Sequence, residues 1–267
     1  MSTLTAPAAP RSVQPSATAP RRPRLLHPTY LRIELRRMLR NRRSAIITLG
    51  LPAVLLLLFG TQEEYRTMDA GRGNVTFYVT VSMGLYGAML ATSSGGASVA
   101  VERAQGWSRQ LRMTPLRPVA YVLTKIVAAM TLGLASVLVV DVVGALSGAS
   151  AEPWVWVATG VAAWLGSSIF AAFGLFLGFV FPAENVMQVL GPGIAVLAFA
   201  GGLFMPLGDG LFATIAQFTP LYGLAELTRA PLTGDGVGLA SVVNVTVWAG
   251  LFVTGAVWRF RGDTARA

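Results

Sequence analysis

The chain has 267 residues, of which 54% are hydrophobic and 12% charged, and its mean hydropathy is +0.59. Soluble domains have about 25% charged residues, so this composition excludes an ordinary soluble domain and indicates a polytopic membrane protein. The chain has no cysteine and a single histidine, His27, which excludes disulfides, a thiol nucleophile and a histidine-rich metal site. We therefore expect no catalytic residue and no metal site in this chain.

The first 28 residues are rich in proline, alanine, serine and threonine. We expect residues 1–28 to form a disordered cytosolic tail, and not a secretory signal, because no apolar run begins before Ala45. Residues 29–43 combine an apolar stripe with an arginine stripe at helical spacing, which predicts an amphipathic helix on an anionic membrane surface. The alternative is a stop-transfer charge cluster. The apolar stripe consists of Leu31, Leu35, Met38 and Leu39, and the basic stripe of Arg32, Arg36, Arg40 and Arg43.

Six apolar segments follow, each near the roughly 20 residues that a helix needs to cross a bilayer. They predict an all-α fold with six transmembrane helices in a domain over residues 44–258, followed by a cytosolic tail over 259–267. The apolar stretches 211–218 and 221–227 are too short to span, and we expect them to form an external re-entrant hairpin. The predicted crossings are residues 44–60, 76–101, 118–147, 154–181, 186–205 and 237–257.

The basic residues are distributed unevenly between the two predicted sides of the membrane. Of the 21 Lys and Arg residues, 18 lie before residue 44, between 102 and 125, or after 258, and only Arg66, Arg72 and Arg229 lie in the other connections. The positive-inside rule then predicts that both termini are cytoplasmic. Because the net charge of +9 is mostly this orientation signal, we expect no nucleic-acid partner. Lys125 is the one lysine, and we expect it to extend its ammonium group to the cytoplasmic headgroups.

The connection after the second crossing reads ERAQGWSRQLRMTP over residues 102–115. An acid at the membrane exit, a glycine, a helix-forming stretch and a Thr-Pro stop predict a compact helix across the membrane face. This stretch resembles the permease subunits of ABC-2 type exporters, of the daunorubicin-type antibiotic and multidrug family, although Trp107 replaces the usual Thr or Ser. The alternative is an ordinary basic loop. The matching residues are Glu102, Arg103, Gly106, Leu111, Thr114, Pro115 and Lys125.

Two later fragments extend this resemblance, which covers about residues 29–257. Glu184 and Asn185 resemble the family's short cytoplasmic turn between the fourth and fifth crossings. The run GLFMP over residues 202–206 resembles the family's exit from the fifth crossing, and Glu226 with Arg229 falls in its external hairpin. The resemblance therefore implies a bacterial plasma-membrane protein with the predicted topology.

The resemblance also implies partners. A Walker A loop needs G-x-x-x-x-G-K-[ST], but Lys125 follows Val-Leu-Thr, so ATP and Mg²⁺ are expected on a separate cytosolic ABC ATPase. Residues 102–115 would dock in that ATPase as the coupling helix, and the chain itself would bind no cofactor. The family further implies a second permease copy or a paralogue, and a small amphipathic substrate such as a drug, an antibiotic or a lipid.

Three charged residues are candidates for an external gate. Asp141 lies 16 residues beyond Lys125, about 24 Å along a helix, and a charged residue at such depth is a functional-site candidate. Glu226 and Arg229 are three residues apart and can meet on one helical face. We expect Arg229 to interact with Asp141 and to link the hairpin to the third crossing. The alternative for Asp141 is an interfacial acid with access to water.

Other functions fit the sequence less well but stay open. The nearest is an exporter of lipid-linked polysaccharide from the same family. An ion-driven secondary transporter would need internal repeats, and the two halves share no repeated motif. An intramembrane enzyme would need several convergent reactive groups, and only Asp141 is charged at that depth.

Overall fold

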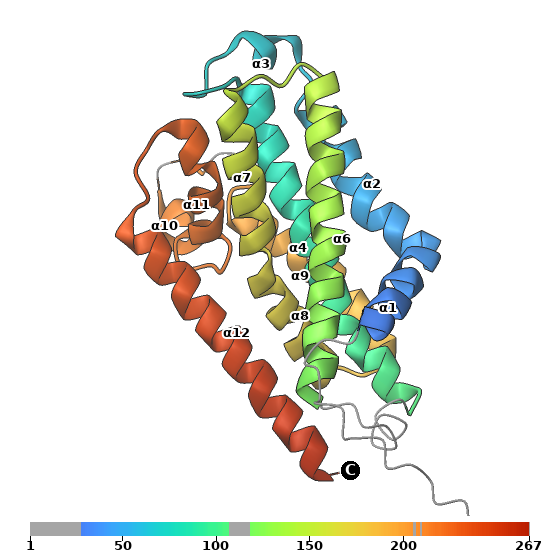
Figure 1. Cartoon of the computed structure of the whole chain (residues 1–267). Coiled ribbons are helices and arrows are strands. Elements are labelled where there is room, and N and C mark those ends of the chain that lie inside the picture. The colour runs from blue at the N-terminus through green and yellow to red at the C-terminus, as the bar shows by residue number, and fades with distance from the viewer. Residues whose placement is uncertain (1–27, 107–117, 205–206, 209, 267) are drawn as a thin grey trace, which may run out of the picture.

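The computed structural model describes residues 28–106, 118–204, 207–208 and 210–266, and these fold into helices joined by short connections. The long helices run side by side in an elongated bundle (Figure 1). In the described part of the chain, five helical segments are long and apolar enough to cross a membrane, which confirms the all-α polytopic fold. They are α4 (Val75–Ala104), α6 (Pro118–Leu146), α7 (Pro153–Gly166) together with α8 (Ser168–Val180), α9 (Ala183–Ala200) and α12 (Leu239–Arg266).

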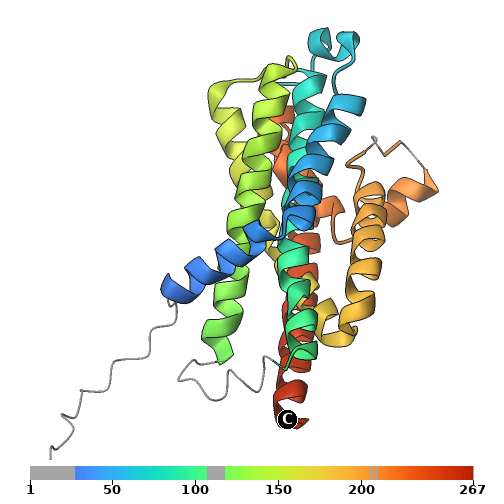
Figure 2. The same ribbon diagram turned by 90° about the vertical axis from the view of Figure 1, so that its right-hand side faces the viewer.

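The first predicted crossing is shorter than the other five. It corresponds to α2 (Arg42–Phe59), whose apolar part is Ala45–Phe59, about 22 Å of helix compared with a hydrocarbon core of about 30 Å. The preceding α1 (Pro28–Arg40) corresponds to the amphipathic helix predicted over residues 29–43, and it projects sideways from the bundle (Figure 2). It ends earlier than predicted, because Arg42 and Arg43 already belong to α2. Five crossings are therefore supported by helix length, and the sixth stays a prediction.

The C-terminal boundary differs from the prediction. Residues 259–267 were expected to form a tail, but α12 continues as a helix to Arg266. The reason is that nothing in this polar stretch breaks a helix, since it contains no proline and only one glycine, Gly262. The predicted tail over residues 1–28 lies outside the described residues, except for Pro28.

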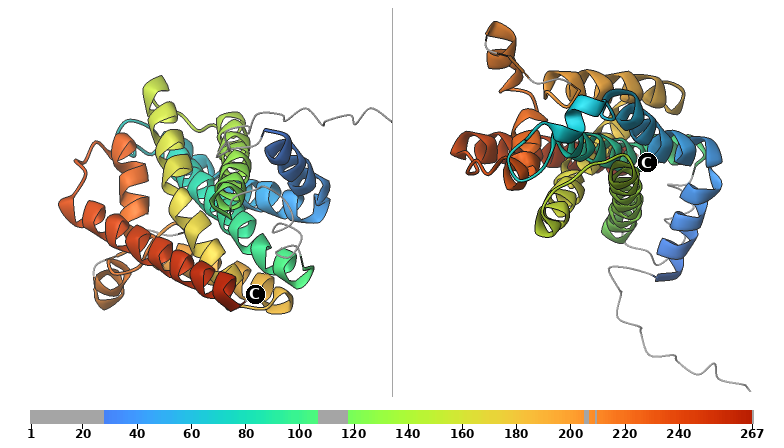
Figure 3. Two further views of the ribbon diagram at one scale, coloured as in Figure 1. Left: turned by 60° about the horizontal axis from the view of Figure 1, so that its bottom comes forward. Right: turned by 90° about the horizontal axis from the view of Figure 1, so that it is seen from above.

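The central helix of the bundle is α4, around which the other long helices are arranged (Figure 3). In the most apolar part of α4, 83% of the residues are buried, a far larger share than in any other helix that could span the membrane. Glycines allow the closest contacts: a Cβ on Gly174 of α8 would collide with the carbonyl oxygen of Ser93, and one on Gly178 would lie 3.1 Å from that of Ala97. The GxxxG spacing in α8 thus brings its backbone against α4.

The fourth predicted crossing consists of two helices, because the helix is interrupted at Ser167 between α7 and α8. The hydroxyl group of Thr92 on α4 donates to the Ser167 carbonyl oxygen at 2.9 Å, and the indole of Trp164 donates to the Met130 carbonyl oxygen, also at 2.9 Å. The first bond pairs a backbone oxygen at the interruption itself, as membrane-buried polar groups require, and the second attaches the end of α7 to α6. The interruption is therefore a fixed junction with α4 and α6.

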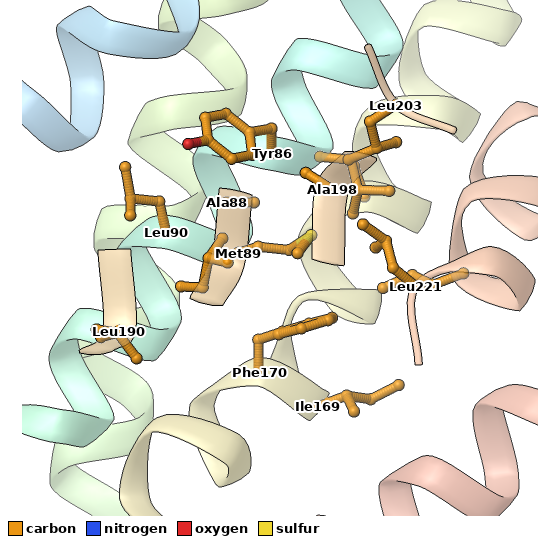
Figure 4. Close-up of a cluster of buried hydrophobic side chains, with 14 of the residues drawn as sticks. Tyr86, Ala88, Met89, Leu90, Ile169, Phe170, Leu190, Ala198, Leu203 and Leu221 are labelled. Atoms are coloured by element: carbon orange, nitrogen blue, oxygen red, sulfur yellow. The ribbon is translucent and has the colours of Figure 1, made fainter. Parts of the chain in front are cut away.

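A cluster of apolar side chains joins α4, α8 and α9 to the segment before α11 (Figure 4). Met89 and Phe170 lie at its centre, and Leu190 and Ala198 approach from α9. Leu221 reaches the same cluster from the hairpin, and all five side chains are at most 1% exposed. The hairpin is therefore packed into the bundle through its apolar residues.

The predicted hairpin contains two helices, α10 (Leu211–Ala216) and α11 (Tyr222–Thr233). The amide of Asn244 on α12 donates to the carbonyl oxygens of Gln217 and Thr219 at 2.8 and 3.1 Å, which fixes the turn between them. Whether this hairpin enters the membrane stays a prediction. The apolar side chains that α10 and the following turn expose are Leu211, Phe212, Ile215 and Phe218.

At the end of the bundle where α3 lies (top of Figure 1), the connections are tied together by Asn74, the residue that caps α4. Its amide nitrogen donates to the carbonyl oxygens of Arg66 and Gly148 at 3.1 and 2.8 Å. Its amide oxygen accepts from the backbone N–H groups of Phe77 and Ser150 at 2.9 and 3.0 Å. Asn74 thereby joins α3 (Glu63–Thr67) to the connection between α6 and α7.

Candidate functional site

Five side chains from α1, α4 and α6 form a polar group inside the bundle, which we call the charged cluster: Glu34, Arg37, Glu102, Tyr121 and Lys125. The carboxylate of Glu102 accepts hydrogen bonds from Arg37, from the Tyr121 hydroxyl and from Lys125. Lys125 also donates to Glu34, and the Arg37 guanidinium lies 3.8 Å from the same Glu34 carboxylate. The cluster therefore ties three separate helices together through one carboxylate.

The charges of the cluster balance while most of it is shielded from solvent. Glu34, Glu102 and Lys125 are at most 3% exposed, whereas the Arg37 side chain is 46% exposed. Burial opposes the positive charge of Arg37, but the carboxylates of Glu102 and Glu34 outweigh it and raise the pKa of Arg37 above its ordinary value. Two acids thus neutralise two bases, which is what allows such groups to be buried.

Lys125 was predicted to reach the headgroups, and this prediction is wrong. Its ammonium group is buried between Glu34 and Glu102, over the Tyr121 ring at 5.8 Å. The reason is that α1 covers this part of α6 and supplies an acid, so the lysine finds a partner inside the protein. The residues that sequence reasoning missed are Glu34, Arg37 and Tyr121. Two weak signals existed: Glu34 is the single acid of an arginine-rich helix, and Tyr121 lies one turn before Lys125.

The neighbouring Arg103 points to a different helix from Glu102. Its guanidinium donates to the carbonyl oxygens of Gly178 and Phe179 at 3.1 and 3.2 Å and lies 5.6 Å from the centre of the Phe179 ring. These carbonyls belong to the C-terminal end of α8, where a cation is stabilised by the helix dipole. The end of α4 is therefore held on one side by α1 and α6 and on the other by α8.

The remaining predicted coupling residues divide into two groups. Gly106 ends α4 with a φ of +71°, a left-handed conformation that favours glycine. Leu111, Thr114 and Pro115 lie outside the described residues. The segment 107–117 nevertheless joins α4 to α6, two helices that both contribute to the charged cluster. Any force on that segment would therefore reach the cluster from both ends.

Glu184 and Asn185 were expected in the turn before the fifth crossing, but they lie in the first turn of α9, just after a tight connection through Phe181 and Pro182. Both side chains are exposed. An acid in the first turn of a helix is stabilised by the helix dipole, which gives Glu184 a local structural role. No contact joins this turn to the charged cluster in the described part of the chain, and its role in coupling stays a prediction.

A second polar group, which we call the arginine cluster, lies near the other end of α4 and consists of Tyr78, Ser82, Gly202 and Arg229. The Arg229 guanidinium donates to the Ser82 hydroxyl oxygen at 2.7 Å and to the Gly202 carbonyl oxygen at 2.8 Å. It also lies 4.4 Å from the centre of the Tyr78 ring, and Arg229 is only 6% exposed. Arg229 thus joins α11 both to α4 and to the turn after α9.

The expected partner of Arg229 was Asp141, and that expectation is wrong. Asp141 instead faces α7, where its carboxylate lies 3.5 Å from the position that a Cβ on Gly160 would occupy. Arg229 links the hairpin to α4, the second crossing, because it emerges on the side of the bundle away from the acid. Glu226 is exposed, and among the described residues it forms no ion pair with Arg229.

The structure gives no sign of a metal centre where side chains are described: no three acidic or histidine side chains gather there closely enough to hold an ion. Both clusters are instead arrangements of hydrogen bonds between helices. Such arrangements hold helices together or let them move relative to one another. The geometry thus defines a polytopic membrane protein in which one helix carries polar junctions near both ends.

The chain belongs to the ABC-2 family of transporter proteins, whose sequence model matches residues 60–259. It is also similar to a protein of Bacillus subtilis (strain 168) described as "Putative transport permease YvfS". The two are 24% identical over 204 residues, which cover 73% of this chain and 82% of the relative. The resemblance found in the sequence is thereby confirmed, and the chain is a transport permease of a family that works with ATPase subunits.

Proposed function

We propose that this chain is the permease subunit of an ABC exporter in the bacterial plasma membrane, which couples ATP hydrolysis on a separate cytosolic ATPase to outward movement of an amphipathic molecule. The observation that carries the coupling role is the charged cluster. Glu102 lies near the end of α4, five residues before the segment 107–117 expected to contact the ATPase, and is bonded to α1 and α6. ATP and Mg²⁺ would be bound by the partner, and this chain would bind neither.

In this mechanism, closure of the ATPase pair displaces the segment 107–117. Because α4 and α6 are bonded to each other and to α1 through Glu102, they move together and do not slide past one another. Arg103 carries the same displacement to α8. The four helices then change access to a cavity shared with a second permease copy or a paralogue.

The arginine cluster is proposed as the external gate of this pathway. Arg229 holds the turn after α9 against α4 through neutral groups, the Ser82 hydroxyl and the Gly202 carbonyl. Water can replace such partners more readily than it can replace a buried carboxylate. Glu226 and Asp141 contribute no contact to this gate in the described structure, although both stay candidates for states that open it.

The proposed cargo is a small amphipathic compound such as a drug, an antibiotic or a lipid. The connections between the helices are short and form no separate binding domain in the described part of the chain. A molecule would therefore be recognised within or beside the bundle, where apolar surface predominates.

The direct test is purification of the permease together with a candidate ABC ATPase, followed by reconstitution in liposomes. We expect the ATPase to co-purify, and ATP to drive movement of a fluorescent amphiphile away from the side that carries the ATPase. Uptake driven by an ion gradient in the absence of any ATPase would contradict the proposal. A Glu102→Gln permease provides the internal control, because it should bind the ATPase and fail to couple hydrolysis to transport.

A further inference from the structure

A cavity of ≈300 Å³ lies beside the charged cluster, and the proposed coupling pathway does not use it. It is bounded by α1, α4, α6 and α9, and its lining follows α4 from Ser94 to Gln105. From Ser94 to Gln105 there are eleven residue steps, which correspond to about 16 Å of helix. Its volume lies at the lower end of the range typical of small-molecule sites. The cavity can therefore hold a small molecule or the polar end of a larger one.

One wall of this cavity is polar and is built by α1 and α4. On α1, the contacts of Arg37 with Glu102 and Glu34 both involve Nη2. The other N–H groups of this guanidinium have no protein partner among the described residues, and the side chain is 46% exposed. On α4, the hydroxyl group of Ser94 borders the same space, and that of Ser98 borders it while donating to the Gly95 carbonyl oxygen at 2.7 Å. The donors that this wall leaves for a ligand are therefore those of Arg37 and Ser94.

Among the described residues that line the cavity, the charged group exposed at its surface is the guanidinium of Arg37. Glu34 also borders the cavity, but its carboxylate is buried and bonded to Lys125. Guanidinium groups donate and cannot accept, and they favour oxygen-rich anionic groups such as phosphate. The polar wall therefore fits a ligand with acceptor oxygens and disfavours a cation.

The opposite wall is apolar and adaptable. It consists of Met38 from α1, Leu132 from α6 and Met187 from α9, and unbranched methionines adjust to tails of different shape. A ligand that satisfies both walls must therefore be amphipathic.

We propose that this cavity binds the polar end of an amphipathic molecule, with Arg37 donating to a phosphate or similar oxygen-rich group and the apolar tail lying along Met38, Leu132 and Met187. The identification of this molecule as transported cargo rests on the proposed function. Such a polar end can belong to a bilayer lipid or to an exported amphiphile. In either case α1 is a wall of the binding site and not only a surface anchor.

The absence of cysteine makes a protection experiment direct. Gln105→Cys places a thiol in the cavity lining, and Ala104→Cys places one at the exposed neighbouring position, outside the lining. The permease–ATPase complex, in phosphatidylcholine nanodiscs, is treated with a water-soluble maleimide in the presence of dodecyl phosphate. At about ten times the Kd, we expect labelling of Gln105→Cys to slow about tenfold and that of Ala104→Cys to stay unchanged. Inorganic phosphate alone and dodecanol alone should not protect.

Two variants test the cavity in different ways, one by removing its charged donor and the other by filling its space. Arg37→Gln should abolish protection of Gln105→Cys by removing the donor. Because Arg37 also supports the charged cluster, Ser98→Leu provides an independent variant, which fills the cavity without altering any charge. It should reduce protection to the level seen without dodecyl phosphate while the Tm of the complex is retained. Full protection in both variants would overturn the proposal.

The source of the ligand is distinguished by the bilayer. If nanodiscs containing phosphatidylglycerol protect Gln105→Cys before any addition, the occupant is a bilayer lipid; if only dodecyl phosphate protects, it is an added amphiphile. Equal protection of both cysteines, or of neither, would contradict the site. Labelling does not require turnover, so protection in a complex that fails to transport would refute only the proposed function. Absence of protection in a complex that transports would refute only the cavity.

Discussion

The two polar clusters on α4 use opposite ways of burying charge. At one end, Glu102 and Glu34 balance Arg37 and Lys125. Near the other end, Arg229 is buried against a hydroxyl, a carbonyl and an aromatic ring, and none of the ion pairs between described residues includes it. Ser82 and Glu102 are 20 residues apart on one uninterrupted helix, about 30 Å, which equals the thickness of a hydrocarbon core.

This difference indicates what each cluster can do. Separating a buried carboxylate from its cations exposes charges on both sides and is strongly unfavourable, so the charged cluster is suited to transmit movement between helices as a unit. Separating a guanidinium from neutral dipoles leaves a cation that water can solvate, so the arginine cluster is suited to open and close. A single rigid helix would then connect a permanent junction to a reversible one.

The largest effect is expected from breaking the permanent junction. Glu102→Gln removes the carboxylate that holds α1, α4 and α6 together and leaves Lys125 and Arg37 with only Glu34. Loss of one partner from a buried pair costs about 3 kcal/mol, so we expect a clear fall in the Tm of the purified complex and loss of ATP-driven export. The matched control is Glu64→Gln, which changes an exposed acid of α3 and should alter neither quantity.

A double variant distinguishes a structural junction from a coupling junction. In Glu102→Gln/Lys125→Met one acid and one base remain, Glu34 and Arg37, so the charges balance again and much of the lost stability should return. Export should stay impaired, because the bonds between α4 and α6 are still missing. Recovery of both stability and export would show that the cluster only holds the fold.

A smaller effect is expected at the reversible junction. Arg229→Ala leaves the Gly202 carbonyl and the Ser82 hydroxyl without this partner, a cost of about 1–3 kcal/mol per buried group. The expected functional result is leakage: preloaded fluorescent amphiphile should leave liposomes faster without ATP. Arg66→Ala, an exposed arginine at the same end, serves as the control. A leak rate equal to that of the wild type would remove Arg229 from the gate.

Much of this fold could be predicted because it depends on local patterns. Long apolar runs determine where α4, α6, α9 and α12 lie. Two short ones predicted the two hairpin helices, although α11 continues to Thr233, six residues beyond the predicted stretch. The prediction did not recognise that α2 is short for a membrane span. The helix itself begins with the basic residues Arg42 and Arg43, so its apolar part is shorter than the helix.

The partners in both clusters were less accessible from the sequence. Counting residues along a helix gives depth, and depth alone placed Asp141 near Arg229. It does not give the direction in which each side chain points around the bundle, and the two residues face different helices. In the same way, the environment of Lys125 depends on α1 lying across α6, a contact between segments 91 residues apart. Such contacts are set by packing of several helices at once.

A double-mutant cycle sharpens this correction. Arg229→Ala and Ser82→Ala remove two sides of one hydrogen bond, so their effects on unfolding free energy should be non-additive, by about 1 kcal/mol. Arg229→Ala and Asp141→Asn affect residues without a mutual contact, and their effects should add. Reversal of these two results would restore Asp141 as the partner of Arg229.

The smallest effect on export is expected from two substitutions that introduce exposed cysteines on either side of α4. Labelling of these cysteines reports the orientation of α4 in the membrane, on which the whole proposed mechanism depends. Met68 precedes this helix and is 50% exposed, whereas Ala104 is an exposed residue at its other end. The distribution of arginine predicts that an impermeant thiol reagent labels Met68→Cys on intact cells and labels Ala104→Cys only after permeabilisation. Neither substitution touches a cluster, so export should be unchanged.

The opposite labelling pattern would place the charged cluster and the segment 107–117 outside the cell. A cytosolic ATPase could not reach them there. The charged cluster could then not receive the movement of the ATPase, and the arginine cluster could not be an external gate.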